Sequence, residues 1–351
     1  MSSIALPLQE VECNTETACN GSQEQHRPIR ILITEPIAQE GVDLLRSKLP
    51  EAQIDERFGL SPVQLQDLIA GYTVLIVRSE TRVTDDILTS AQHLKIVGRA
   101  GAGTDNIDLE AATRRGVLVV NAPRGNVIAA AEHTIAMMMA LARYIPVANN
   151  STKAGRWEKS RFLGFEVAHK VLGILGLGKV GKEVAKRAQG LAMHVLAYDP
   201  HVSAENAGRV GVTLLSMEEV LTRADVVTLH APLIDGPHGT TRLIGSYELS
   251  LLKPGARLIN CARGDLIDEA ALLTALREGR LAGVALDVFS QEPIGDDAVL
   301  RQLLSDTRVI ATPHLGASTV EAQVRVATEV AHRIVSALLR DQLYKLMWTN
   351  T

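Results

Sequence analysis

The sequence predicts an α/β protein with two doubly wound parallel sheets, in which one domain is inserted into the other. Short apolar, β-branched runs alternate with helical segments from residue 29 to residue 311, which is typical of parallel sheets covered by helices on both faces. A glycine-rich turn joins a strand to a helix near the middle of the chain. A long apolar helical segment follows the last strand. We expect this segment to return to the first sheet, which makes the first domain discontinuous and leaves a cleft between the domains.

The first domain is predicted to comprise residues 28–124 and 312–340. One helix is expected to begin at Ser61, because Pro62 suits the first helical position, where a backbone N–H would have no acceptor within the helix. In this domain we expect strands at 29–33, 52–54, 73–77, 94–97 and 117–120, and helices at 39–49, from Ser61, at 84–91 and at 108–115.

The inserted domain is predicted to comprise residues 125–311. A single long helix over 126–149 is expected to lead into it, after the turn Pro123-Arg124-Gly125. The final helix, 318–339, is expected to begin with a capping box, because Ser318 is followed three residues later by Glu321. Strands are expected at 171–175, 193–198, 226–229, 257–260, 283–288 and 309–311, and helices at 182–188, 216–222 and 268–278.

Composition places the chain among ordinary globular proteins, with 46% hydrophobic and 22% charged residues. With a net charge of -4, the chain lacks the excess positive charge that is typical of proteins that bind nucleic acid or an anionic membrane. The longest apolar run, 128–142, is interrupted by polar residues and is predicted to be a buried helix.

Three cysteines, Cys13, Cys19 and Cys261, cannot all pair, so we expect a reducing, cytoplasmic location. Residues 1–27 lack the pattern of a secretory or mitochondrial leader and are interpreted as a disordered extension, and 341–351 as a C-terminal tail. No His/Cys cluster has metal-ligand spacing, so no metal is expected.

The glycine-rich turn carries the first functional signal. Gly176, Gly178 and Gly181 have the spacing G-x-G-x-x-G between a strand and a helix. The first glycine permits the turn, the second lets a pyrophosphate reach the backbone, and the third lets the helix pack on the strand. Asp199 ends the next strand, where a carboxylate can bind ribose hydroxyls and repel a 2′-phosphate. Strand, glycines, helix and acid in this order predict a dinucleotide site that favours NAD over NADP.

Three polar groups that follow strands of the inserted domain are candidates for chemistry. The Arg263 guanidinium could hold a carboxylate and carbonyl, although pairing with Asp265 or Asp268 explains it equally well. His314 lies between a strand end and a helix start, where an imidazole could transfer a proton. Glu292 could bond its second ring nitrogen and fix the tautomer, or be a solvated loop carboxylate.

In the first domain, a second glycine-rich segment, residues 97–106, begins at the end of a predicted strand. Backbone N–H groups at Gly101, Ala102 and Gly103 could receive a substrate carboxylate. Arg78 and Arg99 add positive charge at the same edge and suit a phosphate; alternatively they pair with Glu80 or Asp105.

As a set, GRAGAGTDNIDLEAATRRGV, GILGLGKVG, NCARGDLIDEAAL, ALDVFSQEP and PHLGAST resemble the D-isomer-specific 2-hydroxyacid dehydrogenases, without a break from about residue 29 to 339. The resemblance implies a Rossmann NAD-binding domain inserted into a flavodoxin-like substrate domain. It implies that Arg263, Glu292 and His314 form the catalytic set. We expect the substrate to be bound by Arg78, Arg99, Gly101, Ala102, Gly103, Arg263 and His314.

The resemblance also implies which residues bind the cofactor and how chains associate. It places cofactor contacts at Gly176, Gly178, Lys179, Val180, Gly181, Asp199, Ala231, Pro232, Cys261, Ala262, Arg263, Asp287, His314, Gly316, Ala317 and Ala102. Ala102 stands where relatives often carry a larger or hydroxylated residue. A homodimer or homotetramer through the NAD-binding domain is implied, with residues 153–159 and Trp157 as an arm towards the neighbouring subunit.

The expected reaction is NAD-dependent oxidation of 3-phospho-D-glycerate to 3-phosphohydroxypyruvate, the entry step to serine. Because the chain stops at Thr351, feedback through a C-terminal serine-sensing domain, as in longer relatives, is not expected. Two alternatives stay open: a glyoxylate or hydroxypyruvate reductase, and an NAD-binding sensor that has lost catalysis.

Overall fold

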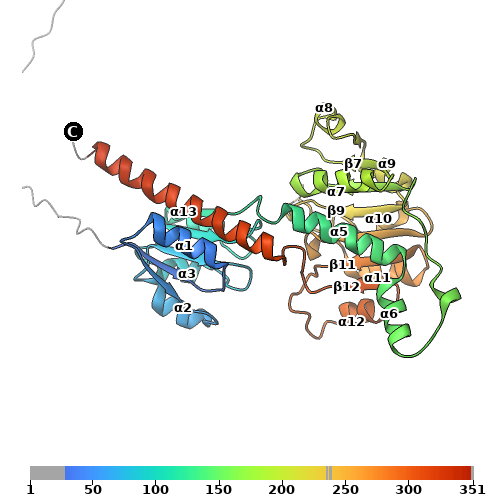
Figure 1. Cartoon of the computed structure of the whole chain (residues 1–351), viewed down its shortest axis with the longest axis horizontal. Coiled ribbons are helices and arrows are strands. Elements are labelled where there is room, and N and C mark those ends of the chain that lie inside the picture. The colour runs from blue at the N-terminus through green and yellow to red at the C-terminus, as the bar shows by residue number, and fades with distance from the viewer. Residues whose placement is uncertain (1–27, 235, 237–238, 349–351) are drawn as a thin grey trace, which may run out of the picture.

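The computed structural model describes residues 28–348 except 235 and 237–238, and the side chains up to residue 340. It contains two lobes, each built on one parallel sheet (Figure 1). The predicted disordered segment 1–27, with Cys13 and Cys19, lies outside the described residues. Among the described residues, no helix combines the length and apolar character needed to cross a bilayer.

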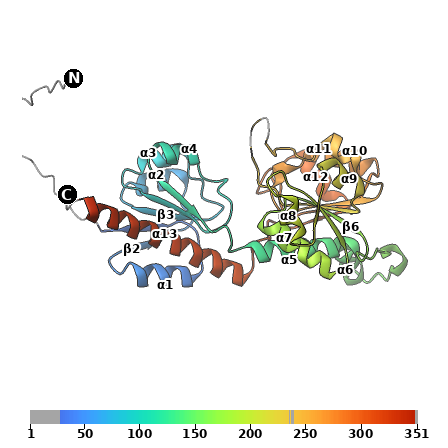
Figure 2. The same cartoon turned by 90° about the horizontal axis from the view of Figure 1, so that it is seen from above.

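The first sheet has the order β2-β1-β3-β4-β5, which is the flavodoxin-like order. Its strands are β1 (Arg30–Ile33), β2 (Gln53–Glu56), β3 (Val74–Val77), β4 (Ile96–Arg99) and β5 (Leu118–Asn121). One face is covered by α2 (Pro62–Ile69), α3 (Asp85–Ser90) and α4 (Leu109–Arg114), and the other by α1 (Gln39–Lys48) and α13 (Val320–Trp348) (Figure 2). Ser61 caps α2 in a capping box with Gln64, and Pro62 occupies the first turn, as the sequence predicts.

The second sheet has the order β12-β11-β10-β9-β6-β7-β8, the Rossmann arrangement with an added edge strand. Its strands are β6 (Val171–Leu175), β7 (His194–Tyr198), β8 (Thr213–Leu214), β9 (Val226–Leu229), β10 (Ala256–Asn260), β11 (Leu281–Leu286) and β12 (Val309–Ala311). Both sheets are parallel throughout, so the predicted fold class is confirmed.

Helices cover both faces of the second sheet. On one face lie α5 (Val127–Ala142) and α7 (Lys179–Gly190), and on the other α9 (Met217–Arg223), α10 (Ser246–Leu251), α11 (Glu269–Arg277) and α12 (Ala298–Ser305). The short α8 (Ala204–Gly208) precedes β8. The predictions omitted α8, α10 and β8, which are too short to give a clear periodic pattern, and also α12, although its apolar residues lie on one face.

The predicted single helix over 126–149 is wrong, because the chain forms two helices there. α5 ends at Ala142, and α6 (Ile145–Lys153) starts after Tyr144, whose φ is 54°. Pro146 lies in the first turn of α6. A proline has no N–H to donate and its ring collides with the carbonyl four residues earlier, so a continuous helix cannot run through this point.

The start and end of the last helix also differ from the prediction. Thr319, not Ser318, caps α13: its hydroxyl accepts a hydrogen bond from Ala322 N at 3.2 Å. The helix runs to Trp348, nine residues beyond the expected end at Leu339. The apolar residues that reach the sheet end at Leu338, so periodicity alone underestimated the length.

Helix α13 packs on the first sheet although it follows the second sheet in the chain (Figure 1). Gly98 of β4 faces Ile334, so closely that a Cβ at this glycine would lie 2.7 Å from Ile334 Cδ1. Gly41 of α1 meets Ala327 in the same way, at 2.7 Å. The absence of side chains at these two glycines lets α13 pack closely against both α1 and the sheet.

We expect Ile334→Ala to destabilise the protein by about 2–5 kcal/mol, because Ile334 is fully buried and its loss leaves a cavity over β4. Urea unfolding followed by circular dichroism measures the change. Val320→Ala is the matched control on the same helix: that side chain is 78% exposed, and the expected change is below ~0.5 kcal/mol. Equal effects of the two substitutions would contradict the packing of α13 on this sheet.

Candidate active site

The glycine-rich turn lies between β6 and α7, at the point where the strand order of the second sheet reverses. Gly176 has φ 99°, and a Cβ there would lie 2.6 Å from Ala231 N. A Cβ at Gly181 would lie 2.2 Å from Gly176 O. Both glycines are therefore required by close backbone approach. In parallel sheets this switch point is where ligands bind, at the carboxyl ends of the strands.

Gly178 differs from its two neighbours, because a Cβ there would have no atom within 4 Å. It is the N-cap of α7, and its backbone is exposed. The first N–H groups of a helix have no partner within the helix and favour an anion. The open space over Gly178 therefore fits the pyrophosphate of a dinucleotide.

Asp199 follows β7 beside this turn. Its carboxylate accepts hydrogen bonds from Leu177 N and from His201 N, both at 2.8 Å. The side chain thus fixes the glycine turn itself, in addition to the ribose contact that the sequence predicts. Lys179 donates to Pro123 O at 3.4 Å, which links the start of α7 to the segment that enters the second lobe.

The remaining predicted cofactor residues follow other strands at the same edge of the sheet. Ala231 and Pro232 come after β9, Cys261 and Ala262 after β10, Asp287 after β11, and His314, Gly316 and Ala317 after β12. Val180 is half-buried in the first turn of α7, and Ala102 lies in the first lobe, after β4.

Asp287 is fully buried and organises the loop that carries His314. One of its oxygens accepts from Thr312 Oγ1 at 2.6 Å and from Leu315 N at 2.7 Å, and the other accepts from Gly316 N at 2.8 Å. His133 Nε2, on α5, lies 3.1 Å from the first oxygen. Burial by itself raises the pKa of Asp287, but these bonds outweigh it and lower the pKa below its ordinary value.

His133, Cys261 and Asp287 form a cluster whose ligand-type atoms lie within 4.8 Å of one another. Sequence spacing did not reveal it, because the three residues come from separate elements. The polar interruption of the apolar helix at His133 was the available signal. The Asp287 oxygens already accept several hydrogen bonds, and burial raises the pKa of the Cys261 thiol to about 12, which keeps it protonated. These observations favour a hydrogen-bonded cluster over a metal site.

His314 and Glu292 are in direct contact. His314 Nδ1 lies 2.7 Å from Glu292 Oε2, and Phe289 N donates to the other carboxylate oxygen at 2.9 Å. Partial burial raises the pKa of Glu292, but the bonds from His314 and Phe289 outweigh it, so the pKa is lowered. An ionised carboxylate can only accept, so Nδ1 carries the proton and Nε2 of the neutral ring is the basic nitrogen.

Arg263 connects the two lobes. Its Nε donates to Asp105 Oδ2 of the first lobe at 2.9 Å, and a Cβ at Gly103 would lie 2.1 Å from its Nη2. The next residue, Gly264, is so close to Phe289 that a Cβ would lie 1.9 Å from its carbonyl carbon. Arg263 therefore lies between the glycine-rich loop of the first lobe and the loop that leads to Glu292.

Arg99 lies against the same glycine-rich loop, where a Cβ at Gly101 would meet its Nη1 at 1.9 Å. Its Nε is buried without a hydrogen-bond partner among the described residues. Burial and the charge of Arg263 lower the pKa of Arg99, while Asp105 opposes this. A buried, unpartnered guanidinium N–H beside a second arginine is the arrangement that an anionic ligand would satisfy.

Arg78 is held by a network that the sequence analysis missed. The buried Glu35 accepts from Arg78 N at 2.8 Å, Glu80 N at 3.0 Å and Thr81 N at 2.9 Å. Asn106 Nδ2 donates to the carbonyl oxygen of Arg78 at 2.9 Å. Glu35 is the second residue after β1, so its place just beyond the end of the strand was the available signal.

We expect Gly178→Ala to weaken NAD binding by about tenfold or more, because its methyl group would occupy the space over the first helical N–H groups. The melting temperature should not change, since that space is empty of protein atoms. Isothermal titration calorimetry measures the binding. Gly190→Ala, at the opposite end of α7 and equally unhindered, is the control and should bind NAD normally. Normal binding by the Gly178 variant would contradict this site.

Comparison with known proteins agrees with this geometry. Residues 135–316 match the D-isomer specific 2-hydroxyacid dehydrogenase, NAD binding domain. The D-3-phosphoglycerate dehydrogenase of Synechocystis sp. is 48% identical over 310 residues, which cover 88% of this chain and 54% of the relative. That of Archaeoglobus fulgidus is 44% identical, covering 88% and 57%. The chain thus spans about half the length of these relatives.

Solved structures show the same architecture over nearly their whole length. The TT0316 protein of Thermus thermophilus has a TM-score of 0.77 and 33% identity, covering 86% of this chain and 94% of that one. The D-lactate dehydrogenase of Aquifex aeolicus, complexed with NAD and lactic acid, has a TM-score of 0.79 and 27% identity, covering 91% and 97%. The predicted family and the predicted cofactor, NAD, are confirmed: the chain belongs to the D-isomer specific 2-hydroxyacid dehydrogenases.

Proposed function

We propose that the protein oxidises 3-phospho-D-glycerate to 3-phosphohydroxypyruvate with NAD, the entry step of serine synthesis. The observation that carries the proposal is the arrangement of Arg99 and Arg263 around the first-lobe glycine loop, together with the His314–Glu292 pair, whose members lie on the loops after β12 and β11. The relatives named D-3-phosphoglycerate dehydrogenase support this substrate.

In the proposed reaction each side chain has one task. Arg263 and the N–H groups of residues 101–103 orient the substrate carboxylate, and Arg78 and Arg99 bind the phosphate. His314 Nε2 takes the hydroxyl proton as the carbonyl forms, and Glu292 stabilises the imidazolium. The residues around Gly178 would hold NAD, which would supply the acceptor for the hydride from the carbon that carries the hydroxyl. One proton and one hydride leave the alcohol, which balances its oxidation to the ketone.

We propose the predicted boundaries as functional units, with 28–124 and 312–340 binding the substrate and 125–311 binding NAD. A reducing, cytoplasmic location suits this enzyme, because Cys261 of the described part is a free thiol.

The second candidate reaction is reduction of glyoxylate or hydroxypyruvate. A glyoxylate reductase from Paecilomyes thermophila, with a TM-score of 0.78 and 28% identity, supports it.

The test is a substrate panel that follows NADH formation and, in reverse, NADH consumption. We expect turnover of 3-phospho-D-glycerate well above that of D-glycerate, D-lactate and glyoxylate. His314→Ala should lower turnover by about 10²–10⁴-fold while NAD binding persists, because only the proton acceptor is lost. Near-normal turnover in this variant would exclude His314 as the base.

Two further variants separate the candidate substrates. Arg78→Ala and Arg99→Ala should raise KM for the phosphorylated acid and leave KM for glyoxylate unchanged. If glyoxylate is the preferred substrate of the unmodified protein, the phosphoglycerate proposal is wrong and the second candidate holds. If no hydroxy acid reacts although NAD binds, the protein is an NAD-binding sensor.

We also propose a homodimer or homotetramer formed through the NAD-binding domain. Trp157 and Leu163, in the segment after α6, are 86% and 85% exposed. Such exposed apolar side chains in one segment are typical of an interface.

Sedimentation equilibrium tests this association, and Trp157→Asp with Leu163→Asp should shift the protein towards monomer, because two charges would enter the interface. Val320→Asp is the control, since Val320 is 78% exposed but lies in the other lobe. A double variant that associates like the unmodified chain would contradict the proposal.

A further inference from the structure

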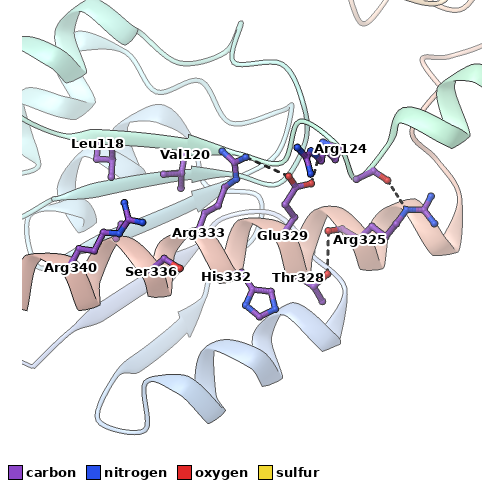
Figure 3. A pocket seen from close by; sticks show the side chains of 12 residues that line it. Leu118, Val120, Arg124, Arg325, Thr328, Glu329, His332, Arg333, Ser336 and Arg340 are labelled. Carbon is purple, nitrogen blue, oxygen red and sulfur yellow. Dashed lines mark hydrogen bonds and ion pairs between the residues drawn. The ribbon is translucent and has the colours of Figure 1, made fainter. Parts of the chain in front are cut away.

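A groove with a volume of about 860 Å³ lies on the first lobe, between β5 and α13. Strand β5 is the edge of its sheet, and Leu118 and Val120 from this strand form one apolar wall (Figure 3). Leu118 is 49% exposed. Ala337 continues the apolar surface on α13. A concave site of this size with an apolar wall is typical of small-molecule sites.

The groove is strongly basic. Arg124, Arg325, Arg333 and Arg340 line it, whereas Glu329 is its only carboxylate among the described residues. In Figure 3, Arg333 and Arg340 rise from α13 towards β5. The other face of α13, which includes Val330 and Ile334, is buried against the sheet. The arginines of the helix therefore lie together on the face that lines the groove.

Two of the four guanidinium groups have no partner in the described part of the chain. Arg124 donates only through its backbone N–H, to Glu329 Oε2 at 3.2 Å, and Arg340 makes no ion pair there. Arg333 Nη2 lies 3.7 Å from Glu329 Oε1, which is a long distance for an ion pair. Arg325 Nε donates to Gly125 O at 2.9 Å. One carboxylate thus faces four arginines, which leaves most of the positive charge unneutralised.

The spacing of the arginines indicates a ligand with two separated anionic groups. Arg333 and Arg340 are seven residues apart, about 10 Å along the helix axis. Arg124 and Arg333 meet around Glu329 at one end of the groove, and Arg340 lies towards the other end. Two phosphate monoesters carry about -3 to -4 charges at neutral pH, which would balance the net charge of the groove.

We infer that this groove binds an organic bisphosphate, with one phosphate at Arg124 and Arg333, the other at Arg340, and the carbon body on Leu118 and Val120. The site is separate from the Arg78, Arg99 and Arg263 cluster, and its ligand does not depend on the proposed reaction. It also adjoins both segments that connect the lobes, because Arg325 binds Gly125 O, and Gly125 packs on Val326.

Calorimetric titration of the full chain with fructose 1,6-bisphosphate, and separately with inorganic phosphate, tests the inference. We expect one bisphosphate per chain, bound at least tenfold more tightly than phosphate. Arg333→Gln with Arg340→Gln should weaken the bisphosphate at least tenfold, and Arg340→Gln alone should weaken it measurably. Glu329→Gln should strengthen binding, because it removes the one negative charge and keeps an acceptor for Arg124 N.

Two control variants make the result specific. Arg114→Gln with Arg115→Gln removes the same charge from the opposite face of the sheet, and Arg78→Gln with Arg99→Gln disables the proposed substrate site; both should bind the bisphosphate normally. Equal loss in the Arg114/Arg115 variant would indicate non-specific attraction, and loss in the Arg78/Arg99 variant would place the ligand in the substrate site. Either result, or no binding to the unmodified chain, would overturn the inference.

Discussion

The buried carboxylate of Asp287 is the interaction on which the site depends. It follows β11, and it binds the hydroxyl of Thr312 and the backbone N–H groups of Leu315 and Gly316. These bonds bring the loop after β12 back over the sheet and fix His314 beside Glu292. A buried charge is tolerated only when it is fully hydrogen-bonded, so the loop has little freedom to adopt another conformation.

A second constraint is that the chain crosses between the lobes twice. It leaves the first sheet after β5 and returns as α13, so residues far apart in sequence form one core. The two crossings touch where Arg325 binds Gly125 O and Gly125 packs on Val326. The site residues of the two lobes are joined by the Arg263–Asp105 pair, whose side chains are 30% and 50% exposed. An exposed pair of this kind contributes little stability, so this pair by itself does not hold the lobes together.

Much of the site could be predicted because a parallel sheet brings its strand ends to one edge. Gly176, Asp199 and His314 each follow a strand, so strand prediction alone placed them together. The partners of these residues could not be predicted in the same way. The sequence left Arg263 with two candidate partners on its own loop, whereas the structure pairs it with Asp105, 158 residues away. Likewise His133 reaches Asp287 only because α5 packs on β11 and β12, and Thr312 reaches it because β12 pairs with β11.

The sequence by itself determined the fold class, the order of most strands and helices, the dinucleotide motif and the family. These follow from periodicity, glycine spacing and local residue order, which are properties of neighbouring residues. Only the tertiary structure decided the Asp287 network and the basic groove between β5 and α13, whereas the break at Tyr144 is a local effect of Pro146 in the first turn of α6. The network and the groove depend on which elements pack together, and local sequence carries no record of that contact.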